Sequence, residues 1–142
     1  MDAGRTEIRL SMRMITEAAT TQVPTTLSYS IEEPYAVTLV FDCRGARPIT
    51  WVFARDLLVA GLVAAAGEGD VRIWPAERSD PIFFELRSPT GHAVFAADRK
   101  SLRRFLAQTE KLVPRGGEPA VMSMDYHLAA LLGGEPGLAP PV

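Results

Sequence analysis

The sequence predicts an α+β fold, with antiparallel β-sheets and packed helices in the order ββββ-α-βββ-α-α. Apolar residues recur at every second position in about seven short runs, which is the period of half-buried strands, and at helical spacing elsewhere. Strands that come in runs before helices favour an α+β arrangement over a parallel βαβ sheet. The 142 residues, 47% of them hydrophobic, suffice for one domain with its own core. We therefore predict a single domain over residues 1–132.

Four strands are expected in the first part of the chain. Their links are short: a polar loop that ends at Pro24, a turn at Pro34, and a turn at residues 43–46. Pro34 marks a turn because proline restricts the residue before it and has no N–H for a ladder. The runs expected as strands are residues 7–14, 26–31, 37–41 and 49–53. Short links between consecutive strands predict an antiparallel meander or a pair of hairpins.

Residues 54–66 change to helical spacing, and Asp56 lies in the first turn, where the helix dipole favours an anion. Apart from Arg55 and Asp56 the segment carries no charge, so nearly every side of the helix requires shelter from water. Two explanations remain open: burial under a strongly curled sheet, or an interface with neighbouring copies of the chain. The glycine turn at residues 67–70 is expected to end the helix.

A second group of strands precedes the longest helix. The strands are expected at residues 71–74, 82–87 and 92–97, with a compact turn at 88–91. Asp98 is the expected N-cap of an amphipathic helix. Its apolar stripe consists of Leu102, Phe105, Leu106, Thr109, Leu112 and Val113.

The last part of the chain is broken by prolines and glycines at residues 114–119. Beyond them, residues 121–124 are expected to be extended, and Asp125 is expected to cap a short helix that ends near residue 132. Residues 133–142 are rich in Gly and Pro and carry little apolar bulk, so this tail is expected to be disordered.

Composition excludes several classes of function. A net charge of −2 provides no large cationic field for a nucleic-acid backbone, which disfavours nucleic acid as a partner. The single cysteine, Cys43, cannot form an internal disulfide, and no Cys/His spacing resembles a zinc site. No apolar stretch approaches the roughly 20 residues that cross a bilayer, which predicts a cytoplasmic protein without membrane insertion.

No residue pattern predicts an active site, a cofactor site or a metal site. The two histidines, His92 and His127, belong to no catalytic motif. Gly67 and Gly69 follow a helix, whereas a dinucleotide loop must follow a strand, so they favour a turn over phosphate binding. The basic cluster of residues 99–104 is typical of a solvated helix face, with an acidic partner as the alternative.

Trp51 and Trp74 favour core packing over stacking on a ligand, since Trp51 shares a strand face with Ile49 and Phe53. If the apolar helix is covered by another chain, the interface includes that helix and its neighbours. The residues predicted for an oligomer or partner interface are Trp51, Arg55, Asp56, Leu58, Leu62 and Trp74.

Four segments resemble the SsgA-like proteins of sporulating actinobacteria. They are EEPYAVTLVF, WVFARDLLVAGL, GEGDVRIWP and SMDYHLAALL, and the similarity runs from about Leu10 to Leu132 with similar spacing throughout. Ala65 departs from the family pattern, which often has proline there, and this difference is expected only to lengthen the helix.

The resemblance implies a fold similar to whirly-type single-strand-binding domains, assembled as a bell-shaped trimer. It implies a non-enzymatic adaptor in sporulation-linked division, which is recruited to the septum and acts on the tubulin-like division ring or the septal wall machinery. A paralogue of the same family is a further expected partner. The alternative is a module that binds single-stranded nucleic acid, with Trp51 or Tyr29 as stacking platforms.

Overall fold

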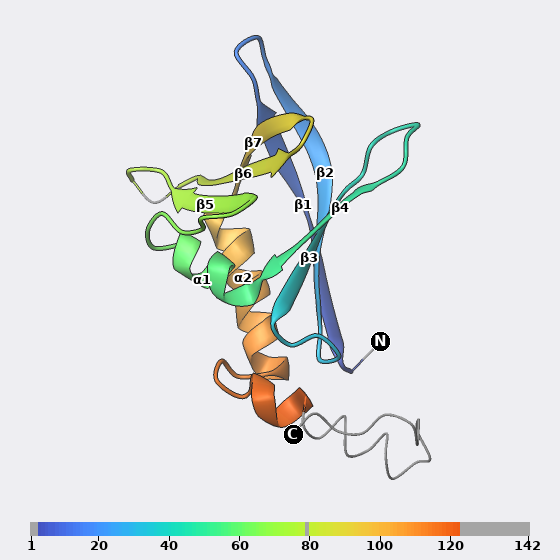
Figure 1. Ribbon diagram of the computed structural model, residues 1–142, viewed down its shortest axis with the longest axis vertical. Helices are drawn as coiled ribbons and strands as arrows, with labels where there is room; N and C mark the ends of the chain where they lie inside the picture. Colours follow the sequence, from blue (N-terminus) through green and yellow to red (C-terminus); the bar gives the residue numbers. More distant parts are fainter. Residues whose placement is uncertain (1–2, 79, 123–142) are drawn as a thin grey trace.

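The computed structural model describes residues 3–78 and 80–122, which form one curled antiparallel sheet with helices on one side (Figure 1). The strand order is β4-β3-β2-β1-β7-β6-β5. The strands are β1 Arg5–Ile15, β2 Thr20–Ser30, β3 Ala36–Phe41, β4 Ile49–Ala54, β5 Val71–Pro75, β6 Ile82–Ser88 and β7 Gly91–Ala97. The helices are α1 Arg55–Gly61 and α2 Arg99–Leu112, and residues 118–122 are also helical. The predicted α+β class, the seven strands and the meander β1 to β4 are confirmed.

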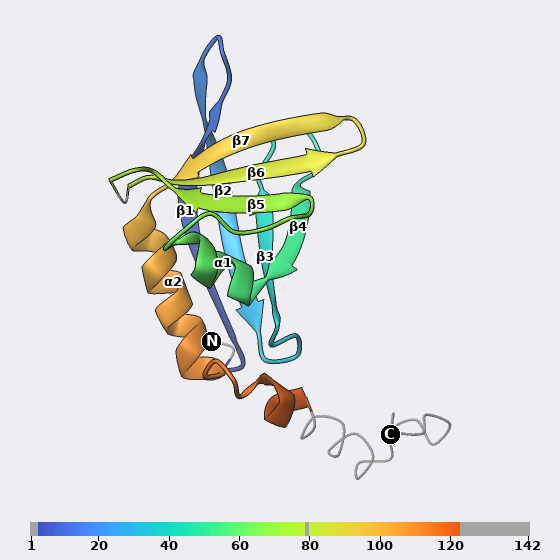
Figure 2. The same ribbon diagram turned by 60° about the vertical axis from the view of Figure 1, so that its left-hand side comes forward.

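Strand β1 joins two halves of the sheet. It pairs with β2 along its whole length but with β7 only at Arg13–Ile15, so β5–β7 turn away from β1–β4 and cross them in both views (Figures 1 and 2). Aromatic contacts tie the facing halves together: the rings of Phe41 and Phe95 stack at 4.4 Å, and Phe53 meets Phe84 edge-on at 6.3 Å. The core therefore lies inside the curl.

The predicted loop that ends at Pro24 is wrong, because β2 begins at Thr20 and includes Pro24. The carbonyl of Pro24 accepts the N–H of Asp42, so the backbone groups of this residue face β3 rather than β1. The β2–β3 ladder ends at the neighbouring pair of Thr25 and Phe41. A proline without an N–H is tolerated here because no ladder bond is required at that edge.

The helix predicted over residues 54–66 is shorter than expected, since α1 ends at Gly61. The chain then turns back, and Ala66 forms both backbone hydrogen bonds of a bridge with Ile73 of β5. A Cβ on Gly61 would lie 2.4 Å from the side chain of Ile73, so only glycine permits this approach. The expectation that Ala65 lengthens the helix is therefore wrong.

The extended segment predicted at residues 121–124 is also wrong for its described part, because residues 118–122 are helical. Pro119 fits the first turn of a helix, where its missing N–H is not needed. The helix predicted for residues 125–132, the domain boundary at 132 and the tail 133–142 lie outside the described residues.

Helix α2 is confirmed as predicted. The side chain of Asp98 accepts the N–H of Ser101, and the apolar stripe packs against the sheet with Leu102 and Phe105 fully buried. Both helices lie on the same side of β1–β4, and the opposite face of these strands carries no covering element among the described residues (Figure 2).

Candidate docking and assembly site

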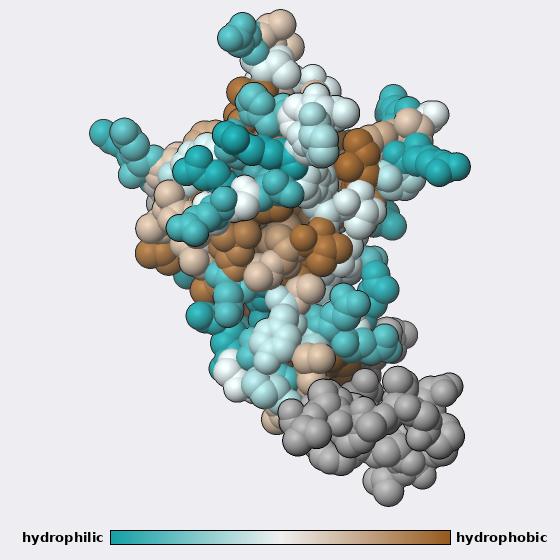
Figure 3. All heavy atoms as spheres, viewed as in Figure 1, coloured by the Kyte–Doolittle hydropathy of each residue, from teal (hydrophilic) through white to brown (hydrophobic). Residues whose placement is uncertain are grey.

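Helix α1 buries its inward side within its own chain. It lies between β4 and β5, and the side chains of Leu58 and Leu62 are 0% and 6% exposed. Just beyond the helix, Val63 is 76% exposed. In Figure 3 apolar atoms gather across the middle of the molecule, where α1 and β5 lie in Figure 1. Burial under the curled sheet therefore accounts for the inner side of α1, whereas its outer end remains open to water.

The side chain of Arg55 is buried under the sheet rather than exposed on a surface. Its first terminal nitrogen donates to the carbonyl of Val113 at 2.7 Å and to the carbonyl and hydroxyl oxygens of Thr109 at 3.3 Å. Its guanidinium carbon lies 4.9 Å from the centre of the Tyr29 ring. Because α2 ends at this point, its last carbonyls receive the positive charge that the helix dipole favours.

Glu118 completes this buried cluster. One of its carboxylate oxygens accepts from Arg55 at 2.6 Å, and the other accepts the N–H of Gly116 at 2.8 Å. The hydrogen bond from Arg55 is the main cause that lowers the pKa of Glu118 below its usual value. The cluster thus joins the start of α1 to residues 113–118, and we call Arg55, Glu118, Thr109 and Tyr29 the buried polar cluster.

Tyr29 closes the cluster from β2. Its hydroxyl donates to the carbonyl of Pro34 at 2.8 Å, and burial raises its pKa. The ring is 2% exposed, so the idea that Tyr29 is a stacking platform for nucleic-acid bases is wrong.

The six residues predicted for an interface do not form one continuous surface in this structure. Leu58, Leu62 and Arg55 lie inside the chain. Asp56 points outward, 73% exposed and 3.7 Å from Arg115. Trp51 and Trp74 are half-buried on β4 and β5, the two ends of the strand order, and Trp74 packs on Phe83 at 5.6 Å. An oligomer interface around α1 stays a prediction.

Beside β4 there is an apolar cleft of about 500 Å³ between the two halves of the sheet. In Figure 2 the β6–β7 hairpin lies beside the N-terminal end of β4, and it forms the opposite wall of the cleft. The apolar residues that line the cleft are Met14, Phe41, Ile49, Trp51, Leu86 and Phe95. Among the described residues that line this cleft, His92, exposed on the hairpin, is the only ionisable one. Of the six residues predicted for an interface, Trp51 is the one that lines this accessible cleft.

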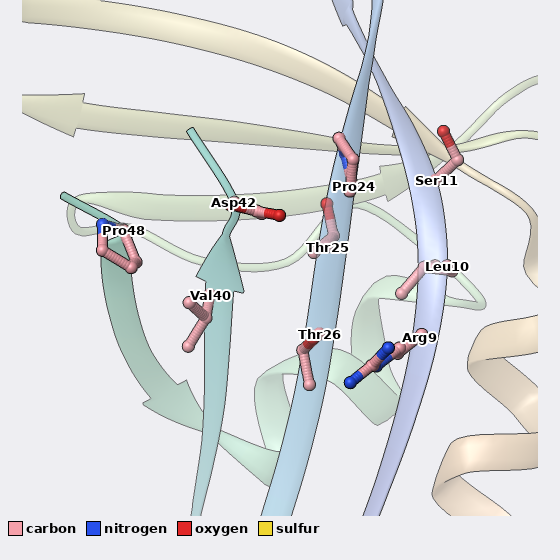
Figure 4. A pocket seen from close by; sticks show the side chains of 9 residues that line it. All are labelled: Arg9, Leu10, Ser11, Pro24, Thr25, Thr26, Val40, Asp42 and Pro48. Carbon is pink, nitrogen blue, oxygen red and sulfur yellow. The ribbon is translucent and has the colours of Figure 1, made fainter. Parts of the chain in front are cut away.

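The uncovered face of β1–β3 carries a second, more polar hollow of similar volume (Figure 4). In Figure 4 Arg9 extends toward Thr26 on one side of the hollow, while Asp42 and Pro48 lie on the opposite side of the hollow. Its lining offers one cation, one carboxylate and hydroxyl groups, but no nucleophile with a base beside it. We find no arrangement for catalysis in this hollow.

The other candidates from the sequence have structural roles or stay open. Gly67 has φ +103°, and a Cβ there would lie 2.4 Å from the carbonyl of Val71, so the turn itself explains this glycine. Lys100, Arg103 and Arg104 are exposed along α2, in agreement with a solvated face. His127 lies outside the described residues.

Over residues 3–78 and 80–122, no group of three or more His, Cys, Asp or Glu side chains is placed to hold a metal ion. Among the same residues, no helix is long and apolar enough to cross a membrane.

Comparison with known proteins identifies the family. A family described as "Streptomyces sporulation and cell division protein, SsgA" matches residues 23–118, about two thirds of the chain. The chain belongs to the SsgA family. A sporulation-specific cell division protein SsgB of Salinispora tropica is 40% identical over 133 residues, which cover 90% of this chain and 93% of the relative. This family is one of sporulation and cell division proteins and is not a known enzyme family.

Two solved SsgA-family structures share the fold. The SsgA-like sporulation-specific cell division protein of Thermobifida fusca superposes with a TM-score of 0.82 at 34% identity, covering 92% of this chain and 98% of that one. SsgB of Streptomyces coelicolor gives a TM-score of 0.77 at 36% identity, covering 82% and 94%. The work on the second protein states that mutations in SsgB correlate with longitudinal cell division during sporulation. The resemblance seen in the sequence is thereby confirmed.

Sequence reasoning missed Glu118 and Thr109 as partners of Arg55. The available signal was Arg55 itself, because an arginine at the start of an otherwise apolar buried helix requires a counter-charge inside the fold. The identity of that counter-charge had no signal, since Glu118 lies 63 residues away along the chain.

Proposed function

We propose that the protein is a non-enzymatic adaptor in sporulation-linked cell division. In this proposal it is recruited from the cytoplasm to the septum, where it docks the tubulin-like division ring protein, septal wall proteins or a paralogue of its own family. The observation that carries the proposal is the match to a sporulation-specific cell division protein over about nine tenths of both chains. The accessible features are an uncovered face of β1–β3, an apolar cleft and charged helix faces, and none of them brings a nucleophile together with a base among the described residues.

We further propose that the adaptor is a homotrimer. Contacts between exposed charges contribute roughly 0.2–1 kcal/mol each, so a single docking surface holds a partner weakly. Several copies in one assembly raise the effective concentration of each surface for the next partner site, so that weak contacts hold together at a septum. The exposed outer end of α1, with Val63, fits a contact between copies.

A fluorescent fusion of the full chain, followed through sporulation, tests the septal role. We expect bands at future septa together with the division ring, and loss of regular septa when the gene is deleted. A uniform cytoplasmic signal at septation, with normal septa after deletion, would contradict the adaptor role.

Light scattering of the purified full chain tests the trimer separately. One chain has a mass of 15.5 kDa, so a trimer has about three times that mass at micromolar concentration. A single-chain mass over the whole concentration range would remove the homo-oligomer from the proposal, and Val63→Lys should lower the mass if the outer end of α1 forms the contact.

A further inference from the structure

Strand β4 is an open edge of the sheet. It ends the strand order, and the N–H of Arg55, directly after it, donates to the carbonyl of Tyr35 beside β3. Backbone groups of successive strand residues point to opposite edges. Those of Thr50, Val52 and Ala54 therefore point away from β3. All three residues are exposed, and the described residues provide no hydrogen-bond partner for this edge.

The other edge of the sheet is protected, in contrast to β4. On β5, Ile73 exchanges both backbone hydrogen bonds with Ala66, which covers the middle of that strand. β4 has the sequence Ile-Thr-Trp-Val-Phe-Ala, without charge, proline or glycine, and Ile49 and Val52 are 50% and 57% exposed. Natural edge strands usually carry a charge, a proline or a bulge that prevents pairing. β4 has the composition of a strand that is paired.

The surroundings of β4 define the chemistry of its occupant. Ile49 and Trp51 point into the apolar cleft, so a strand added beside β4 would place every second side chain in that cleft. The exposed cations Arg44 and Arg47 precede β4, and the described residues place no acidic side chain in contact with either. Asp56 follows β4 and is 73% exposed. An antiparallel strand would bring its C-terminal end to the arginines and its N-terminal end to Asp56.

We propose that β4 binds an extended peptide segment of a partner protein by β-strand addition. The segment lies antiparallel to β4, alternates apolar and polar residues over about six positions, and carries carboxylates at its C-terminal end. Main-chain hydrogen bonds to Thr50, Val52 and Ala54 hold it, while its apolar side chains enter the cleft beside Trp51. The inference deepens the adaptor role proposed above, on which it rests, by naming a docking surface and the class of partner.

The test uses the full chain and a fluorescein-labelled peptide, Lys-Val-Thr-Val-Thr-Val-Thr-Asp-Glu, titrated by fluorescence anisotropy. We expect saturable binding that weakens at least tenfold when the threonines are N-methylated, because this removes the donors that face β4. The reversed peptide, Glu-Asp-Thr-Val-Thr-Val-Thr-Val-Lys, should bind at least fivefold more weakly, because its carboxylates then lie near Asp56. Equal binding of the N-methylated peptide, or no saturable binding, overturns the proposal.

Variants of the chain locate the site. Val52→Pro removes an N–H that faces solvent and should weaken binding at least tenfold, while the matched control Val52→Thr keeps the N–H and should stay within threefold. Arg44→Glu with Arg47→Glu should weaken the peptide with C-terminal carboxylates and spare an amidated version that ends in lysine. If Val52→Pro does not fold by circular dichroism, the N-methylated peptide still decides the result.

The same experiments test whether another copy of the chain occupies β4. They also separate a failure of this inference from a failure of the adaptor role. If the chain forms a dimer or a trimer that Val52→Pro splits and that excludes the peptide, β4 pairs with another copy and the inference is wrong. Loss of peptide binding with intact septal localisation overturns only this inference. Tight peptide binding with diffuse localisation supports the edge site and contradicts the adaptor role.

Discussion

Two segments that pack on the same side of the sheet are held by different forces. Helix α2 is held by an apolar stripe, with Leu102 and Phe105 fully buried against the strands. Residues 113–118, which follow it, are held by the buried polar cluster through Arg55 and Glu118. Apolar burial is insensitive to pH and tolerates similar shapes, whereas a buried ion pair fails when either partner is lost. The first segment fixes the fold, and the second is a point where stability can be altered selectively.

The largest expected effect is the loss of apolar packing under α2. Phe105→Ala should lower the free energy of unfolding by about 3–5 kcal/mol, because a buried aromatic side chain leaves a cavity that relaxes only partly. Denaturant unfolding followed by circular dichroism measures this loss. Phe105→Leu keeps most of the volume and should cost clearly less. A loss below 1 kcal/mol for the alanine variant would show that α2 contributes little to the core.

Removal of the cation from the polar cluster should rank next. Arg55→Met leaves the Glu118 carboxylate buried without its partner, which typically costs about 3–5 kcal/mol. We expect the lower part of that range, because the carboxylate keeps its hydrogen bond from the N–H of Gly116. The matched control is Arg115→Met, since Arg115 is half exposed and its ion pairs are 3.7 and 4.0 Å long. We expect about 0.5 kcal/mol or less for the control. Equal losses at both sites would contradict the role of the cluster.

Neutralising Glu118 tests whether the stability that the buried polar cluster contributes depends on pH, unlike that of the apolar stripe. The pKa of Glu118 is lowered by the hydrogen bond from Arg55, so its contribution is present above the unfolded pKa near 4.5 and is lost as pH falls through the lower folded pKa. Glu118→Gln should cost about 1–3 kcal/mol at pH 7 and flatten the decline in stability below about pH 5. Urea unfolding at several pH values between 3 and 7 measures both. The pKa of Asp98 is also lowered, so this group adds to the loss of stability at low pH. Asp98→Asn serves as a comparison that measures its contribution.

The sequence allowed prediction of the segments held by local and apolar forces. The period of two in the strands, the Asp98 cap and the stripe of α2 are visible within short windows of the chain, and all are confirmed. The end of α1 at Gly61 was missed because it depends on a close contact with Ile73 on another element. The position of Pro24 inside β2 was missed because a proline is tolerated only where the neighbouring ladder stops.

The candidate site was less predictable than the fold. Arg55 was expected on an interface, whereas it lies inside the chain, because its partners Thr109 and Glu118 are more than 50 residues away. The open edge of β4 could not be predicted for the same reason, because it depends on residues far apart in the sequence. No single segment encodes that β5 is covered by Ala66 while β4 is left uncovered, since both facts depend on strand order.

The smallest loss of stability is expected at the start of α2, where Asp98 caps the helix. Asp98→Ala removes the acceptor for the N–H and the hydroxyl of Ser101, which lie 3.0 and 2.8 Å from the same carboxylate oxygen. The loss of such a cap should cost about 1 kcal/mol, measured by the same denaturant unfolding. Asp98→Ser keeps a capping oxygen and should restore most of that loss. Because a cap acts only on the first turn, a cost as large as that of Phe105→Ala would mean that α2 is held at its start rather than by its apolar stripe.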